Sequence, residues 1–409
     1  MNLLPKASGT RPRVACDIST QGVVAARSEA TGSPLAAISR VELAEGAVVP
    51  SLKPGNIADR VAVAAAVRNA LEAVGAKAHS RDGDITLIIP DAAVRVSLLD
   101  FDSLPTRLTE ALPIVRFRLK KLLPFDADDA MVTFQIMSTS KTVVRVLTVA
   151  IPRDVLREYE TAVREAGFEP GAVIPSTVAA LAAMEEDPAL LINANVQGVT
   201  AAIVRGGILL LHRTVDLQVL PTGTPANLPP ALFDAPSAAL PSMTLPLVSV
   251  EETAGEWAAQ EPLPEHGRNP YADRVSDEAA VQEEKNITGL PVPPVFASDS
   301  YVSSNGTAPH EEPSFSNQHI PALGEEIAQA VSVAVAYFED TLAVVPERIL
   351  SAGPLGAVEL NRILTEHGLA QADGLRVNEL VGSDALLADA VTAGVPRGWM
   401  SGVLGALRG

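Results

Sequence analysis

The spacing of apolar residues changes several times along the chain, and these changes predict a mixed α/β fold. Short apolar runs with the period of two typical of strands open the chain, and apolar residues from Val61 to Val74 then recur at helical spacing. Before residue 186, this pattern predicts strands at 13–18, 23–28, 35–43, 85–89, 94–101, 131–137 and 143–151. It predicts helices at 59–74, 112–122, 152–167 and 176–185.

The second half of the chain repeats the opening arrangement. Three further strands are expected at 190–193, 199–204 and 208–214, with a glycine hairpin turn at 205–207. After an interruption, the pattern predicts helices at 324–342 and 357–367, a strand at 348–350 and a closing element at 402–407. Two halves of this kind indicate duplication, and 409 residues exceed what one hydrophobic core usually serves. We therefore expect two lobes with a cleft between them.

An acidic, Pro-rich segment interrupts the second half. Residues 221–321 hold sixteen of the 32 prolines, and residues 221–320 carry fourteen Asp or Glu against three Lys or Arg, a net charge of −11. Prolines at this density remove backbone donors, which predicts a disordered insertion, with an ordered surface loop as the alternative. The predicted organisation is a flexible tail at 1–12, a first lobe at 13–185 with an inserted subdomain at about 85–150, and a second lobe at 186–220 plus 322–409.

Charge, cysteine content and the length of apolar stretches limit where the protein can be located and what it can bind. The net charge of −18 disfavours nucleic acid as a partner, and a single cysteine, Cys16, fits a reducing compartment. Apolar stretches are too short or too interrupted for a signal peptide or a membrane span, so we expect a cytoplasmic protein without direct membrane insertion. The predicted helix at 112–122 is basic, and we interpret it as a solvated face rather than an anion-binding or membrane-binding patch.

The tight turn between the first two strands of each half is the candidate site for chemistry. In such a fold the two turns face each other across the cleft, and phosphates require unobstructed N–H groups together with a carboxylate that holds Mg²⁺ through water. The turns are Asp17–Gly22 and Asn193–Gly198, and a third turn, Ser351–Pro354, stands where a nucleobase and ribose would lie. The candidate cofactor is ATP with Mg²⁺, with Asp17 as metal ligand, and the candidate binding residues are Asp17, Ser19, Thr20, Asn193, Asn195 and Gly353.

These turns and three short motifs resemble those of the PilM family of actin-like type IV pilus assembly proteins. That family is related to the division protein FtsA and to the cytoplasmic part of the type II secretion L component. The motifs are Leu122-Leu123-Pro124-Phe125-Asp126, Ala166-Gly167-Phe168-Glu169-Pro170 and the terminal Gly405-Ala406-Leu407-Arg408-Gly409. The resemblance covers the chain outside the insertion, and it implies an actin-like, ribonuclease H-like duplicated fold.

The departures from the family pattern concern the phosphate turns. The first turn of the family reads roughly D-I-G-S-x-x-x-K, where this chain has Ser19 for the glycine and Val24 for the lysine. The second reads D-I-G, where this chain has Asn193 and Asn195. Asparagine is a neutral, poorer ligand for Mg²⁺, and a side chain at position 195 would crowd a phosphate. ATP hydrolysis, nucleotide binding without turnover and a vestigial cleft all stay open, but the sequence favours the last, so we do not expect an enzyme.

The resemblance implies an assembly scaffold rather than a catalyst. Its expected partners are the cytoplasmic tail of a PilN-like bitopic protein, held in a groove of the first lobe, and other pilus platform components. Self-association through the inserted subdomain is also implied, and the location is cytoplasmic, peripheral to the inner membrane through partners. Residues 2–5, Asn-Leu-Leu-Pro, are similar to the motif that opens the PilN tail, either by mimicry or by chance.

Two other functions compete with the scaffold. One is a phosphotransferase of the sugar-kinase or acetate-kinase type, or another actin-like ATPase, which would need a catalytic Asp and intact phosphate turns. The other is a division protein like FtsA, which would need an amphipathic membrane helix after Arg408.

Overall fold

A computed structural model describes residues 12–79, 84–185, 187–217, 320–369, 375–392 and 394–408. All of them belong to one unit formed by residues 1–222 and 313–409. The predicted N-terminal tail, apart from Pro12, lies outside the described residues. So does the predicted insertion at 221–321, except that its end falls inside a helix that begins at Ile320.

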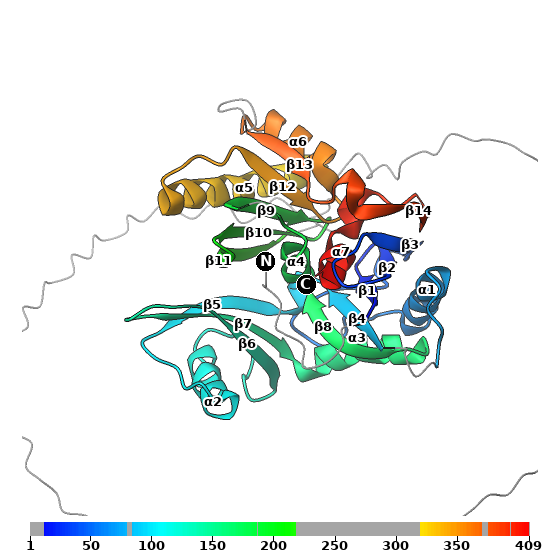
Figure 1. Cartoon of the computed structure of the whole chain (residues 1–409), viewed down its shortest axis with the longest axis horizontal. Helices are drawn as coiled ribbons and strands as arrows, with labels where there is room; N and C mark the ends of the chain where they lie inside the picture. The colour runs from blue at the N-terminus through cyan, green and yellow to red at the C-terminus, as the bar shows by residue number, and fades with distance from the viewer. Residues whose placement is uncertain are drawn as a thin grey trace, which may run out of the picture. The chain divides into compact units, whose positions relative to one another are not determined.

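The first sheet contains the opening meander and has six strands in the order β14-β3-β2-β1-β4-β8 (Figure 1). β2 is antiparallel to β1 and β3, whereas β4, β8 and β14 lie parallel to their neighbours. The strands are β1 (Val14–Ile18), β2 (Gly22–Ser28), β3 (Leu35–Glu42), β4 (Asp84–Ile89), β8 (Glu169–Pro175) and β14 (Leu386–Thr392).

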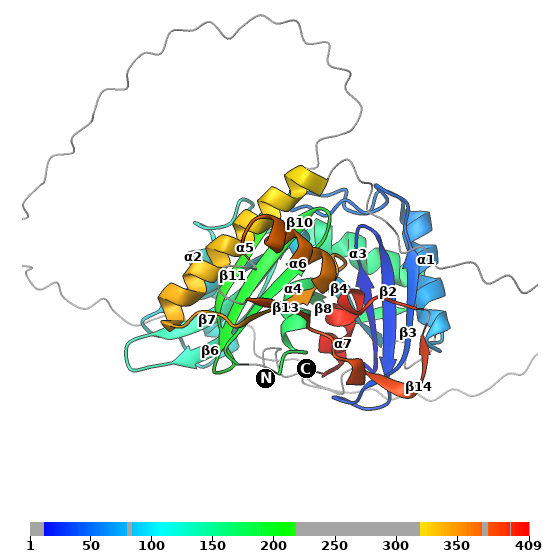
Figure 2. The same cartoon turned by 90° about the horizontal axis from the view of Figure 1, so that it is seen from above.

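Helices cover both faces of this sheet, so β1 is buried on both sides (Figure 2). Successive residues of a strand point to opposite faces. Cys16 accordingly packs in the core with α1 (Arg60–Ala73) and α3 (Arg153–Glu165), while Ala15 packs with α7 (Ser401–Arg408). α1 begins after Asp59, whose side chain accepts a hydrogen bond from the N–H of Ala62.

The second sheet has five strands in the order β11-β10-β9-β12-β13. Its strands are β9 (Ala189–Ala194), β10 (Gly198–Arg205), β11 (Ile208–Asp216), β12 (Arg348–Ala352) and β13 (Arg376–Glu379). Leu190 and Ile192 pack on one face against α5 (Ile320–Leu342) and α6 (Gly356–Glu366). Leu191 packs on the other face against α4 (Ser176–Leu181) and the residues that follow it.

The helices α4 and α7 lie between the two sheets and cross very closely. A Cβ atom at Gly405 of α7 would lie 1.8 Å from the carbonyl oxygen of Ala179 in α4, so only glycine fits there. α4 contributes Ala179 to the core of the first sheet, and Ala180 and Leu181 to that of the second. This helix pair therefore joins the two lobes.

A third, antiparallel sheet of order β5-β7-β6 extends from the first lobe, between β4 and α3 in the sequence. Its strands are β5 (Arg95–Phe101), β6 (Ala130–Thr139) and β7 (Val144–Pro152), and η1 (Asp91–Ala93) leads into it. α2 (Leu108–Leu119) packs on this sheet, on the side away from β11 of the second lobe (Figure 1). None of the described helices is long and apolar enough to cross a membrane.

The predicted α/β fold of two related lobes is confirmed, and several local predictions are corrected. α2 begins at Leu108, four residues before the predicted start. The strands β8, β13 and β14 and the short helices η2 (Ser383–Ala385) and η3 (Arg397–Met400) were not predicted. β8 contains Pro170 and Pro175, which disfavour a central strand, but it is the edge strand of its sheet, where prolines are tolerated.

Candidate functional site

The six residues predicted from the sequence lie around one pocket. Asp17, Ser19 and Thr20 come from the end of β1 and the turn after it, and Asn193 and Asn195 come from the equivalent part of the second lobe. Gly353, in the turn after β12, borders the same pocket. The cavity volume of this pocket is about 50 Å³. Neither lysine nor arginine is among the described residues that line it.

The first turn is held by its own hydrogen bonds. Both the N–H and the Oγ of Ser19 donate to the carbonyl oxygen of Gly22, over 2.9 and 2.8 Å. A Cβ atom at Gly22 would lie 2.6 Å from the carbonyl oxygen of Val41 in β3, so the hairpin needs glycine here. Ser19 thus replaces a glycine without obstructing the turn, because its hydroxyl folds back onto the backbone.

Asp17 places a carboxylate against the start of α7. Burial, and secondarily the negative charge of Asp91, raise the pKa of Asp17 to about 7. A Cβ atom at Gly402 would lie 2.7 Å from Oδ2 of Asp17, so glycine allows the helix to approach the carboxylate. The protonated form of Asp17 is therefore favoured to a higher pH than in a free carboxyl group.

A second buried carboxylate, Asp91, was not among the predicted site residues. Its Oδ1 accepts a hydrogen bond from the N–H of Thr177 over 3.1 Å, and its Oδ2 accepts one from Oγ1 of Thr177 over 2.5 Å. Asp91 stands at the start of η1, directly after β4 and Pro90, and Thr177 lies in the first turn of α4. An aspartate that follows an apolar strand was the available sequence signal, but nothing in the sequence connects it to Thr177, 86 residues later.

Asn193 reaches across the cleft to this cluster. Its Nδ2 lies within hydrogen-bond distance of three oxygens: Oγ of Ser176 at 3.0 Å, Oγ1 of Thr177 at 2.9 Å and Oδ2 of Asp91 at 3.3 Å. The amide can donate two hydrogen bonds at a time. Since Asn193 belongs to β9 of the second lobe and Asp91 to the first, its amide connects the two lobes.

Asn195 closes the second turn on itself. Its Oδ1 accepts hydrogen bonds from the N–H groups of Gln197, over 2.8 Å, and Gly198, over 3.0 Å. This is the local arrangement by which asparagine side chains stabilise turns. The N–H groups of Gln197 and Gly198 are therefore engaged by the side chain.

The third turn is packed tightly against the second. Gly353 has φ of +85°, and a Cβ atom there would lie 2.3 Å from Oδ1 of Asn193. The N–H of Gly353 donates to the carbonyl oxygen of Gly398 over 3.0 Å. A Cβ atom at Gly398 would in turn lie 2.1 Å from the carbonyl oxygen of Gly353. Two glycines thus bring the turn after β12 onto η3, which the sequence analysis missed.

A half-buried histidine lies close to the cluster. His212 is on β11, the edge strand that contacts η1, and burial lowers its pKa while the charge of Asp91 partly opposes that shift. Its Nε2 is buried and has no hydrogen-bond partner among the described residues. Within those residues, no set of three or more His, Cys, Asp or Glu side chains gathers as a metal-binding group.

The fold is shared with a solved structure of the "PilM-PilN type IV pilus biogenesis complex". The two align with a TM-score of 0.57 at 12% sequence identity, over 97% of this chain and 97% of that chain. The cytoplasmic domain of EpsL from Vibrio cholerae, an inner-membrane component of the type II secretion system, aligns with a TM-score of 0.33 at 12% identity, over 50% and 70% of the chains. The ethanolamine utilization protein EutJ from Carboxydothermus hydrogenoformans gives 0.40 at 10% identity, over 100% and 91%.

Only the first of these three alignments exceeds a TM-score of 0.5, and we base the fold assignment on it. It confirms the fold that the resemblance implied, which is the fold of the PilM-PilN structure. No protein-family model and no curated protein sequence matches the chain.

Proposed function

We propose that this chain is a cytoplasmic, actin-like scaffold of a type IV pilus assembly platform. In this proposal it binds the cytoplasmic tail of a PilN-like bitopic protein and is thereby held at the inner membrane. The fold shared over 97% of both chains with the PilM-PilN structure supports it. Contacts with other platform components and between copies, the latter through the subdomain at about 85–150, belong to the same proposal.

The single observation that carries the scaffold interpretation of the cleft is the contact between Asn193 and Asp91. In an actin-like ATPase, the residue at this position would supply a carboxylate toward the metal. Here Asn193 supplies a donor that lies 3.3 Å from Asp91 and 2.9 Å from Thr177 across the cleft. An aspartate at 193 would instead face the carboxylate of Asp91, and like charges at this distance repel strongly in a buried site.

The residues of the cleft are a poor match to ATP with Mg²⁺. The triphosphate is highly charged, but the described lining offers Asp17 and Asp91 and no basic side chain. Asn195 engages the N–H groups of the second turn, and Asp91 is engaged by Thr177. We therefore propose that the site formed by Asp17, Ser19, Thr20, Asn193, Asn195 and Gly353 is degenerate for hydrolysis, and that Asn193 serves the cohesion of the two lobes.

The partner is tested by calorimetry with the full chain and a synthetic peptide of the cytoplasmic tail of a PilN-like protein from the same genome. The expected result is saturable binding with a dissociation constant on the order of micromolar, typical of short extended peptides. A peptide of the same composition in scrambled order is the control. Equal heats for both peptides would contradict the partner proposal.

The cleft is tested separately by phosphate release from ATP in the presence of Mg²⁺. We expect background rates for the wild-type chain and for Asp17→Ala alike. A rate above background that Asp17→Ala abolishes would show that the chain is an ATPase, and it would favour the kinase-like alternative if phosphate reached an acceptor. Peptide binding could still hold in that case, so the two parts of the proposal fail independently.

A further inference from the structure

The outer face of α2 and of the turn after it carries large apolar side chains beside basic ones. Phe117 is 68% exposed and Ile114 is 41% exposed. Residues three or four apart on a helix are neighbours, which puts positions 114, 117 and 118 on one side of α2, and Lys121 and Leu122 follow in the turn after the helix. We call this surface the α2 patch, and it consists of Ile114, Phe117, Arg118, Lys121 and Leu122.

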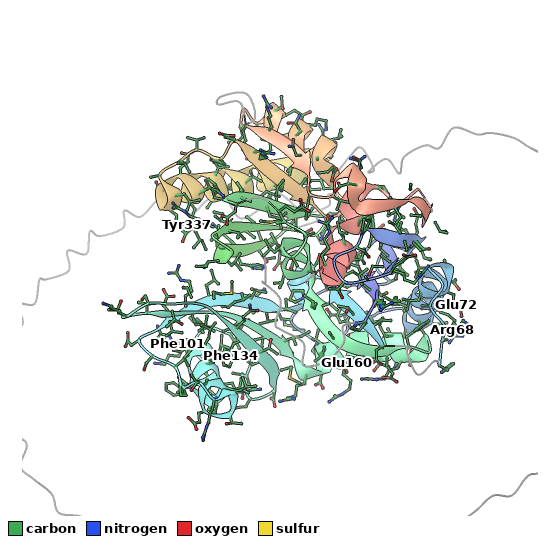
Figure 3. The ribbon with its side chains drawn as sticks, viewed as in Figure 1. Arg68, Glu72, Phe101, Phe134, Glu160 and Tyr337 are labelled. Carbon is green, nitrogen blue, oxygen red and sulfur yellow. The ribbon has the colours of Figure 1, made fainter. Side chains whose placement is uncertain are left out.

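The opposite side of α2 is already packed, so the helix cannot rotate to bury the patch. Val115 and Leu119 are fully buried in a core that also contains Phe101 and Phe134 of the three-stranded sheet. Figure 3 shows these two aromatic side chains between the sheet and α2. No other described helix covers the outer face of α2 (Figure 1).

The charge around the patch is opposite in sign to that of the whole chain. Residues 107–121 contain five basic residues and one acidic residue, a net charge of +4, whereas the chain carries −18. Arg116 donates to the carbonyl oxygen of Ala127, and Lys120 pairs with Asp128 over 2.6 Å. Among the described residues, Arg118 and Lys121 have no such partner, and both are exposed beside Phe117.

We propose that the α2 patch adsorbs to the surface of a bilayer that contains anionic phospholipids. An aromatic and an aliphatic side chain flanked by Arg and Lys on one helix face is the arrangement of interfacial helices, whose apolar groups enter the headgroup region while the cations contact anionic lipids. The net positive charge of this segment on an acidic chain selects an anionic surface. The patch lies on one outward-facing helix and the turn after it rather than in a groove, which suits a flat surface.

This inference does not depend on the proposed pilus function. It requires neither a partner tail nor the state of the cleft, and it concerns adsorption, not a membrane span. It revises the sequence-based interpretation of residues 112–122 as a solvated face. The reason is that the burial of Val115 and Leu119 on one side of α2 leaves Phe117 exposed on the other.

The test is co-sedimentation of the full chain with vesicles of phosphatidylglycerol and phosphatidylcholine, compared with pure phosphatidylcholine, at low salt. Binding is expected with the anionic vesicles only, and it should weaken when salt is raised. Each basic residue near an anionic surface contributes a factor of about five, so R118A/K121A should lower the partition coefficient about 25-fold. Phe117→Ser should lower it at least about tenfold, since a buried aromatic side chain is lost from the interface.

Matched controls use the same substitutions elsewhere on the surface. Val358→Ser changes a side chain that is 86% exposed on α6, and K53A/R205A removes two exposed cations outside α2, so neither should change the partition coefficient. Because Phe117 is exposed, Phe117→Ser should leave the unfolding temperature unchanged. A Phe117→Trp variant should in addition show a blue-shifted emission with anionic vesicles.

Three results would overturn the proposal. The first is equal binding to both kinds of vesicle, and the second is equal loss for Phe117→Ser and Val358→Ser. The third is concentration-dependent self-association without lipid that Phe117→Ser abolishes, together with no vesicle binding. That outcome would make the α2 patch a contact between copies of the chain.

Discussion

The two hairpins that face each other across the cleft share an equivalent backbone hydrogen bond, from Ser19 to Gly22 and from Asn195 to Gly198, but differ in their side-chain chemistry. In the first, Asp17 keeps a carboxylate that receives no hydrogen bond from the described residues and has its pKa raised to about 7. In the second, Asn193 and Asn195 direct their side chains to protein partners, one across the cleft and one within the turn.

One half of the cleft is thus engaged by hydrogen bonds within the protein, while the other half keeps an ionisable group. The second hairpin connects the lobes and engages its own N–H groups, so its asparagines stabilise the protein. In the first hairpin, burial and the charge of Asp91 both disfavour the ionised form of Asp17. Ionised Asp17 therefore lowers the free energy of unfolding above neutral pH. Substitutions in one hairpin at a time separate the stabilising effect of the asparagines from the ionisation of Asp17.

The largest effect is expected for Asn193→Asp. The new carboxylate would lie beside Asp91 in the buried cluster, and an uncompensated buried charge typically costs about 3–5 kcal/mol of unfolding free energy. Urea unfolding at pH 8 measures this loss. Asn378→Asp makes the same substitution at an exposed position of β13 and should cost far less. Similar losses for both variants would show that Asn193 does not hold the lobes together.

A smaller, pH-dependent effect is expected for Asp17→Asn. The pKa of Asp17 is about 7 in the folded chain against 3.8 for the free group, so the folded state binds the extra proton between about pH 4 and 7. The contribution of Asp17 to the free energy of unfolding is therefore greatest below pH 4, and it is lost as pH rises through 7. A rise of about three pKa units limits the loss of unfolding free energy to about 4 kcal/mol. Contact of the half-buried side chain with cleft water reduces the expected loss to roughly 1–2 kcal/mol.

The variant cannot ionise, so it should be more stable than the wild type at pH 8 and similar to it at pH 4. Chemical unfolding over this pH range measures the difference, and Asp216→Asn removes a charge from an exposed position as the control. A variant that is less stable than the wild type at pH 8 would contradict the raised pKa of Asp17.

The smallest effect is expected for Asn195→Ala, which loses two hydrogen bonds within a half-buried turn. The expected loss is about 1 kcal/mol of unfolding free energy, because turn-capping hydrogen bonds of this kind are worth about that much. Asn195→Asp keeps the accepting oxygen and should retain most of the stability. If Asn195→Ala instead gained ATP binding, the side chain would be the obstacle to the nucleotide rather than a support for the turn.

The sequence by itself determined the elements whose signals are local. The two meanders, their turns and most helices follow from apolar periodicity and from glycine positions such as Gly22, because these depend on neighbours a few residues away. The six candidate residues were predicted from the tight turns of an expected duplicated fold, and they line one pocket because the two hairpins face each other. The domain boundaries and the roles of these residues stay predictions.

Only the tertiary structure decided the contacts between distant segments. Asp91, Thr177 and Asn193 form one cluster although 102 residues separate the first from the last, and the edge strand β14 joins the first sheet beside β3. The close crossing at Gly405 and the outward position of Phe117 likewise depend on which face of a helix is already covered. Periodicity identifies a face that can be buried, but packing against the rest of the chain selects the partner, and for α2 it left an apolar side chain exposed.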